Sequence, residues 1–167
     1  MSVTRLHIPF ILVALLVGCT TVPEQIRAPS GDRHLMSWQA TGNWVYHCRL
    51  SNDGQRLAWA TLRPDAELRT ASGQVVGRIA AGPNLVHQDG SVAELTLRTQ
   101  TEMAGALPWA LYEARSEGSA GVLAAVTSAQ QVRTTGGAVP TAGCSNGEQV
   151  MNERAVPFTA EFRLYGR

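Results

Sequence analysis

A short apolar run ending in Leu16-Val17-Gly18-Cys19 determines how much of this chain can fold and in which compartment it does so. The run covers residues 8–17, about ten residues, and follows one basic residue, Arg5. A helix of about ten residues rises roughly 15 Å, whereas a membrane span needs about 20 apolar residues. The pattern therefore predicts a cleaved lipoprotein signal peptide over residues 1–18, with Cys19 as the first mature residue and the carrier of a lipid on its thiol.

An ordinary buried cysteine in an N-terminal helix is the alternative interpretation of Cys19. Lipidation is favoured instead by the length of the apolar run, the basic residue before it, and the small residue Gly18 followed by the cysteine. Two or three acyl chains hold a protein stably on a membrane, whereas one binds only marginally. Thr20 follows the cysteine and resembles the pattern exported to the outer membrane, whereas Asp at that position usually retains a lipoprotein in the inner membrane. We expect a cell-envelope protein anchored in the outer membrane and facing the periplasm.

Cys48 and Cys144 are the two cysteines that remain after Cys19. Because the cell envelope is oxidising, an even pair of cysteines there usually forms a disulfide. The bridge would close a loop of about 96 residues, worth roughly 4–5 kcal/mol in the chain-entropy model. Two free buried thiols are the alternative. A catalytic cysteine is disfavoured further, because no histidine-paired signature is visible.

Removal of the signal peptide leaves 149 residues (167 minus 18), enough for one domain and a tether. Residues 19–39 are expected to form the flexible tether, because Pro23 and Pro29 break any regular pattern there. The folded domain is expected over residues 40–167. A chain of this size buries about two thirds of its unfolded surface, so it can form a real core.

Charge and motif content exclude several functional classes. Without Arg5, 13 arginines balance 13 acidic residues, so the formal charge of the mature chain is near zero. Nucleic-acid-binding proteins normally show a basic patch, so no nucleic acid partner is expected. The chain has no lysine, which excludes lysine-based chemistry. Nucleophile-elbow, zinc-protease, Cys-x-x-Cys, P-loop and dinucleotide motifs do not occur, so we predict no catalytic residue, cofactor or metal.

Alternating apolar and polar residues predict half-buried strands. They occur at residues 44–50, 91–99 and 156–165. Asp53-Gly54 and Asp89-Gly90 are typical of hairpin turns, because these residues accept the positive φ angles that such turns need. Residues 120–132 suit a helix as well as a strand. The pattern predicts a mainly β fold, either a single antiparallel β-sandwich or a partly open, barrel-like domain, closed by one disulfide.

Several short motifs occur in an order and spacing that match one family. They are Gly42-Asn43-Trp44-Val45-Tyr46-His47-Cys48, Trp59, Ala66-Glu67-Leu68, Val76-Gly77, Ala81-Gly82-Pro83, Asp89-Gly90-Ser91, Leu107-Pro108-Trp109, Val132-Arg133-Thr134-Thr135-Gly136-Gly137-Ala138-Val139-Pro140, Gly143-Cys144, Val156-Pro157-Phe158-Thr159-Ala160-Glu161-Phe162 and Tyr165. From about residue 40 to its end, the chain resembles the bacterial and fungal family known as domain of unknown function 3455.

The resemblance implies no chemistry, because the family has no established activity, but it supports the pairing of Cys48 with Cys144. Members often carry a His-aromatic pair just before Ala-Gly-Pro and a Trp soon after it. This chain has Ile79, Ala80 and Leu85 at those places. If the His and Trp form a functional site in other members, this chain has lost or altered it.

His87, Asp89 and Ser91 are the closest approach to a catalytic or metal-binding group in the sequence. A triad or a zinc site would need partners from elsewhere in the chain. We favour an Asp-Gly turn in which Asp89 accepts hydrogen bonds from backbone donors. His34 and His47 are isolated, and we expect surface or satisfied side chains there.

Large aromatic side chains can line a stacking surface for a sugar or peptide, but they also dominate cores, and we favour the core. They are Trp44, Tyr46, Trp59 and Trp109. Trp109, after Pro108, is the best candidate for an exposed ring. Arg133 either binds a ligand carboxylate or pairs with Glu113 or Glu161 as a structural bridge, and the sequence leaves both open.

We therefore expect a lipid-anchored protein with a non-enzymatic binding or structural role. Its partners are the membrane, through Cys19, and an unknown protein or small-molecule ligand. Asp89, Trp109 and Arg133 lie beside loop signals, and we predict that they flank one exposed face that binds this partner. The alternative is a small, hydrolase-like envelope enzyme using Asp89, His87 or Arg133. An enzyme would bring polar groups together in one cleft, whereas a binding module would show an exposed apolar or aromatic patch.

Overall fold

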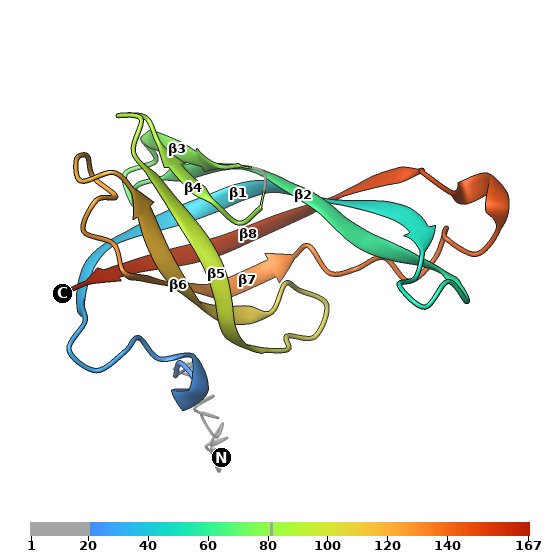
Figure 1. Ribbon diagram of the computed structural model, residues 1–167, viewed down its shortest axis with the longest axis horizontal. Coiled ribbons are helices and arrows are strands. Elements are labelled where there is room, and N and C mark those ends of the chain that lie inside the picture. The colour runs from blue at the N-terminus through green and yellow to red at the C-terminus, as the bar shows by residue number, and fades with distance from the viewer. Residues whose placement is uncertain (1–20, 81) are drawn as a thin grey trace, which may run out of the picture.

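The computed structural model describes residues 21–80 and 82–167, so the expected signal peptide and Cys19 lie outside the described residues. Within this part of the chain, eight antiparallel strands follow one another around a closed barrel, and the last pairs with the first (Figure 1). The elements are η1 (Glu24–Ile26), β1 (Arg33–Leu50), β2 (Leu57–Arg69), β3 (Val75–Ile79), β4 (Leu85–His87), β5 (Val92–Thr101), β6 (Trp109–Glu117), β7 (Ser128–Gly136), η2 (Gly147–Gln149) and β8 (Glu153–Gly166). The mainly β prediction is confirmed in its barrel-like form, and the ring is closed rather than partly open.

The barrel interior is filled by the apolar face of each strand. On β8, Phe158, Ala160, Phe162 and Leu164 are buried at every second position, as the alternation in the sequence predicts. An eight-stranded barrel is just wide enough for side chains to fill it or for one small ligand. Which of the two occurs depends on how large the inward side chains are at each level.

The residues that the sequence left between helix and strand contribute to β7. This strand begins at Ser128, and residues 122–125 form a turn before it. No helix in the described part of the chain is long and apolar enough to cross a membrane.

Three strands continue beyond the barrel as a ribbon. Pairing between β7 and β8 ends at Gly136 and Phe158, and pairing between β2 and β3 ends at Ala66 and Ile79. Past these points β1 still pairs with β2 on one side and with β8 on the other. We call this ribbon, together with the loop that leads into β8, the arm; it comprises residues 43–65 and 138–157 (Figure 1).

The arm is fastened by the expected disulfide. Cys48 on β1 is bonded to Cys144 in the loop before β8, with their Cα atoms 5.5 Å apart. Beside it, Trp59 Nε1 donates a hydrogen bond to the carbonyl of Ala142 at 3.0 Å, and the Arg154 guanidinium lies 5.6 Å from the Trp59 ring centre. These contacts hold the long β7–β8 loop against the ribbon.

The segment before β1 differs from the expected tether. Ile26 in η1 is completely buried against Trp109 and Val132 on the outside of the barrel. The Gln130 amide donates to the Ile26 carbonyl at 2.5 Å. β1 already begins at Arg33, so in the described residues 21–39 the segment is not the predicted flexible tether, and the barrel starts before the predicted boundary at 40. The prolines that indicated a flexible tether instead flank a short docked segment.

Candidate ligand pocket

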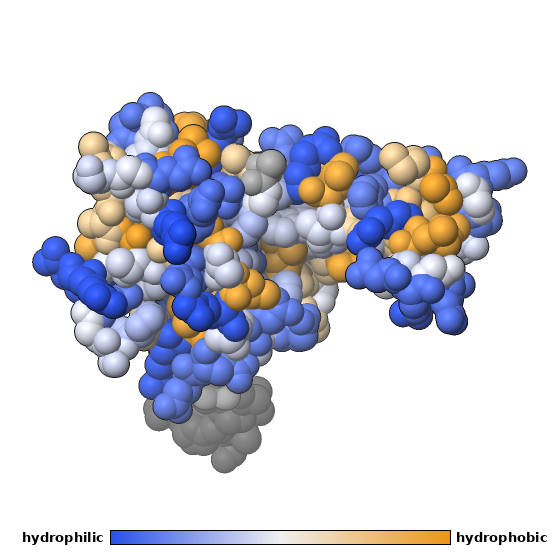
Figure 2. Space-filling model, in the orientation of Figure 1, coloured by the Kyte–Doolittle hydropathy of each residue, from blue (hydrophilic) through white to orange (hydrophobic). Residues whose placement is uncertain are grey.

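A pocket of about 620 Å³ opens where the arm leaves the barrel. Figure 2 shows hydrophobic residues in the recess between these two parts of the molecule. The walls come from the inner face of the arm, the end of β5, the β5–β6 loop, the β3–β4 turn and the loop after β7. The lining residues include Trp44, Tyr46, Thr61, Arg63, Gln100, Glu102, Met103, Ala106, Leu107, Ala110, Tyr112, Gln131 and Val139.

Aromatic side chains of the arm form one wall, and their polar atoms are already bonded within the protein. Trp44 Nε1 donates to the Thr61 hydroxyl at 3.3 Å, and its ring packs edge-on against Phe158. The buried Tyr46 hydroxyl donates to the Gly137 carbonyl at 2.6 Å, and burial raises its pKa to about 12. The wall therefore presents mainly carbon to the pocket.

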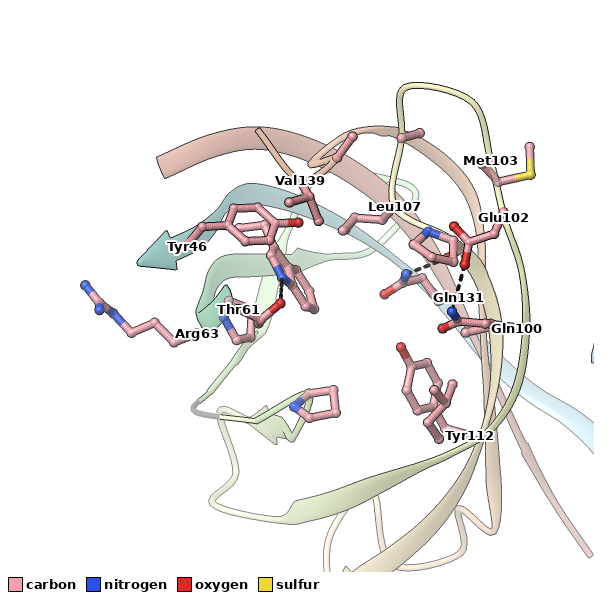
Figure 3. Close-up of a pocket in the computed structure, with 18 of the residues that line it drawn as sticks. Tyr46, Thr61, Arg63, Gln100, Glu102, Met103, Leu107, Tyr112, Gln131 and Val139 are labelled. Atoms are coloured by element: carbon pink, nitrogen blue, oxygen red, sulfur yellow. Dashed lines mark hydrogen bonds between the residues drawn. The ribbon is translucent and has the colours of Figure 1, made fainter. Parts of the chain in front are cut away.

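The floor of the pocket is formed by two neutral polar side chains. Tyr112 on β6 and Gln131 on β7 come from paired strands and point into the cavity (Figure 3). Burial raises the pKa of Tyr112 to about 12, so its hydroxyl stays protonated. Gln131 is only 3% exposed, and its Nε2 donates to the Pro108 carbonyl at 2.9 Å.

Charge is confined to the rim of the pocket. Among the described lining residues, Arg63 and Glu102 are charged, and both are exposed. Arg63 lies 3.5 Å from the Glu153 carboxylate, and Glu102 accepts a hydrogen bond from Gln100 at 2.8 Å. The interior of the pocket is therefore neutral.

The cluster around Asp89 lies at the opposite end of the barrel and is built as a turn. Its carboxylate accepts hydrogen bonds from the Ser91 hydroxyl at 2.6 Å and from the backbone N–H groups of Ser91 and Val122, both at 2.8 Å. His87 Nδ1 lies 2.9 Å from the same carboxylate, and its ring stacks on Trp38. These hydrogen bonds, led by the one from the Ser91 hydroxyl, hold the pKa of Asp89 well below its usual range.

This arrangement does not activate a nucleophile. The Ser91 hydroxyl donates to Asp89, and its oxygen accepts from the Leu123 N–H at 3.2 Å. In a hydrolytic triad the serine proton goes to the imidazole, and the carboxylate orients the imidazole. Here the carboxylate lies between the serine and His87, so the geometry favours the turn interpretation.

The predicted shared face of Asp89, Trp109 and Arg133 is wrong. Trp109 is 6% exposed because η1 covers it. The Arg133 side chain is 65% exposed, and its Nη1 lies 3.0 Å from the carboxylate of Glu161, which also binds Arg163. Arg133 thus takes the structural role that the sequence left open.

Glu161 is buried and forms ion pairs with both Arg133 and Arg163. Burial opposes its ionisation, but the hydrogen bond and charge of Arg163 and then of Arg133 outweigh it and lower the pKa of Glu161. Arg133 reaches it from a bulge between Val132 and Thr135, where its own φ is 51°.

Tyr112 and Gln131, which form the floor of the pocket, were not predicted from the sequence as site residues. On β6, Ala110, Tyr112 and Ala114 are buried at alternate positions. This alternation could have indicated that Tyr112 faces the barrel interior. On β7, two adjacent glutamines are buried between the apolar residues Ala129 and Val132. The first glutamine, Gln130, is fully used, because it binds Ile26 and the Tyr165 hydroxyl.

Two of the three departures from the usual family pattern lie in the core. Ile79 on β3 and Leu85 on β4 are buried and directly paired. In this chain these positions therefore pack the barrel. Among the described residues, no three His, Cys, Asp or Glu side chains come together in a way that could hold a metal ion.

Comparison with known proteins places the whole barrel in one family. The family model described as "Protein of unknown function (DUF3455)" matches residues 29–166. No curated protein and no solved structure matches the chain.

Proposed function

The chain belongs to the DUF3455 family, and from this premise we propose that it is a binding protein for a small apolar molecule held at the mouth of its barrel. The observation that carries the proposal is the pocket of about 620 Å³ with an aromatic wall and a neutral interior. Ligand pockets typically measure about 300–1,000 Å³, are mainly apolar, and occur at the mouths of β-barrels. The pocket therefore has the size and chemistry of a small-molecule site.

The alternative of a small hydrolase has less support. General acid–base or nucleophilic catalysis needs a base within about 2.6–3.2 Å of the group that it deprotonates. The Asp89 cluster uses its serine, carboxylate and backbone donors to hold a turn, and it lies at the far end of the barrel from the pocket. Arg133 is engaged by Glu161.

We also propose that Cys19 carries a lipid and holds the barrel at the outer membrane, facing the periplasm. The lipobox Leu16-Val17-Gly18-Cys19 supports this, and the Cys48–Cys144 disulfide fits an oxidising compartment. In cells, Cys19→Ser should abolish incorporation of labelled palmitate and leave an unprocessed precursor. Continued labelling of that variant would contradict the proposal.

Binding is tested with N-phenyl-1-naphthylamine, an uncharged dye that fluoresces in apolar surroundings. The wild-type protein should bind it saturably at one site. Ala106 lines the pocket and is half-buried, so Ala106→Trp should fill the cavity and weaken dye binding by about tenfold or more, equal to about 1.4 kcal/mol.

Ala104, in the same loop, is exposed and does not line the pocket, so Ala104→Trp is the matched control and should bind like the wild type. The proposal fails if the wild type shows no saturable binding, or if Ala106→Trp and Ala104→Trp bind the dye equally well.

A further inference from the structure

The floor of the pocket contains an acceptor without a donor. Gln131 Oε1 is buried and makes no hydrogen bond within the described part of the chain. The amide is not free to turn over, because Nε2 donates to the Pro108 carbonyl, and a flip would bring two oxygens together there. A buried acceptor without a partner is costly, so such groups in folded proteins are usually satisfied by water or a ligand.

Tyr112 supplies the complementary group. Its hydroxyl points into the same cavity (Figure 3), and no described residue binds it. Because it stays protonated, it can donate to an oxygen atom of a ligand. Donor and acceptor thus lie on adjacent strands at the bottom of one apolar cavity.

We infer that the ligand is a neutral apolar molecule with a hydroxyl group, which donates to Gln131 Oε1 and accepts from the Tyr112 hydroxyl. The inference rests on the proposed function, since it concerns the ligand of the same pocket. A hydroxyl group is both donor and acceptor, so one group satisfies both side chains. The remainder of the ligand then lies against Trp44 and the apolar wall above.

Charged ligand groups fit this floor poorly. A carboxylate would lose its hydration in a neutral interior and would bring negative charge towards the Gln131 oxygen. A cationic group would find no carboxylate at the floor, because Glu102 lies exposed on the rim. A pure hydrocarbon would leave the Gln131 acceptor unpaired.

The test compares three ligands of similar length in displacing N-phenyl-1-naphthylamine: 1-dodecanol, its methyl ether and dodecanoate at pH 7. The ether keeps the acceptor oxygen but lacks the donor. We expect 1-dodecanol to displace the dye about tenfold better than the ether, the factor expected for an unpaired buried acceptor. Dodecanoate should displace it less well than 1-dodecanol.

Substitutions then test which residues cause the preference for the alcohol over its ether. Gln131→Leu should bring the alcohol-to-ether ratio close to one. Tyr112→Phe should weaken both ligands by a similar factor and keep their ratio. Gln74→Leu is the matched control, because Gln74 is an exposed glutamine between β2 and β3 that does not line the pocket, and its ratio should equal that of the wild type.

An alcohol that binds no better than its ether to the wild type would overturn the inference, as would a Gln131→Leu protein that keeps the preference. In both cases saturable dye binding would leave the proposed function standing. A wild-type protein that does not bind the dye saturably would remove the proposed function itself, so the two failures are distinguishable.

Discussion

At the end of the barrel beside the β4–β5 turn, side chains fill the interior, whereas at the end beside the arm the interior stays hollow. Leu123 and Val126, from the β6–β7 loop, are buried in the main core and plug the filled end. Asp89 and Ser91 hold that loop by its backbone N–H groups. At the hollow end the floor is Tyr112 and Gln131, and both line the open pocket.

The comparison shows how one closed sheet can combine stability with binding. Main-chain pairing closes the ring of eight strands, so the closure of the sheet does not depend on the ligand site. Apolar packing at the filled end stabilises the fold, and this allows a cavity and an unpaired acceptor to persist at the other end. Substitutions at the two ends should therefore have different consequences.

The largest effect is expected from removing the disulfide that fastens the arm beside the hollow end. Cys48→Ala combined with Cys144→Ala should lower the free energy of unfolding by roughly 4 kcal/mol, because the bond closes a long loop of the unfolded chain. Urea denaturation of the oxidised wild type and the variant measures this difference. A loss below about 1 kcal/mol would show that the arm is held by its noncovalent contacts alone.

Removal of the plug at the filled end should have the next largest effect. Leu123→Ala should cost about 3 kcal/mol, because it leaves a cavity in the core. Val122→Ala is the matched control; this neighbouring side chain is partly exposed, and we expect a change within about 0.5 kcal/mol. Dye binding by the folded Leu123→Ala protein should stay near the wild-type value, and a large loss would contradict the separation of the two ends.

A smaller, pH-dependent effect should follow from Asp89→Asn. The pKa of Asp89 is lower in the folded protein than in the unfolded chain, where it is about 3.9. Its stabilisation is therefore present above about pH 4 and disappears as the pH falls towards the folded pKa. The melting temperature of the wild type should exceed that of the variant at pH 7, and the gap should narrow below pH 4. A gap that is independent of pH would show that the charge of Asp89 is not what holds the loop.

The smallest effect is expected at the floor of the hollow end. Tyr112→Phe should change the free energy of unfolding by less than about 1 kcal/mol, because no described residue binds the hydroxyl that it removes. Urea denaturation without ligand checks this. A larger loss would indicate that the hydroxyl supports the fold, and it would weaken the contrast between the two ends.

The sequence predicted the strands well but could not predict how the ring closes. Alternation at 91–99 and 156–165 corresponds to β5 and β8, because side chains alternate between the two faces of a strand. Alternation does not say which strands pair. Closure depends on pairing between β1 and β8, which lie far apart in the chain, so a sandwich and a barrel were both compatible with the pattern.

The candidate site was harder to predict, because its key properties arise from neighbours distant in sequence. Trp109 seemed available for binding only because the segment containing Ile26 was interpreted as a tether; that segment covers it. Gln130 and Gln131 are adjacent and equally buried, yet one is satisfied and the other is not. The Asp-Gly turn at Asp89 was predictable, since its main contacts are local.

The docking of η1 on the barrel wall limits the length of the free segment between Cys19 and the barrel. Val22 already packs beside Ile26, and Met103 contacts the same small cluster while also lining the pocket. With a lipid on Cys19, as proposed, the three peptide steps to Val22 reach at most roughly 10 Å. The short segment would then keep the barrel, and with it the mouth of the pocket, close to the bilayer surface. Cargo dissolved in that bilayer would have a short route to the cavity with little passage through bulk water.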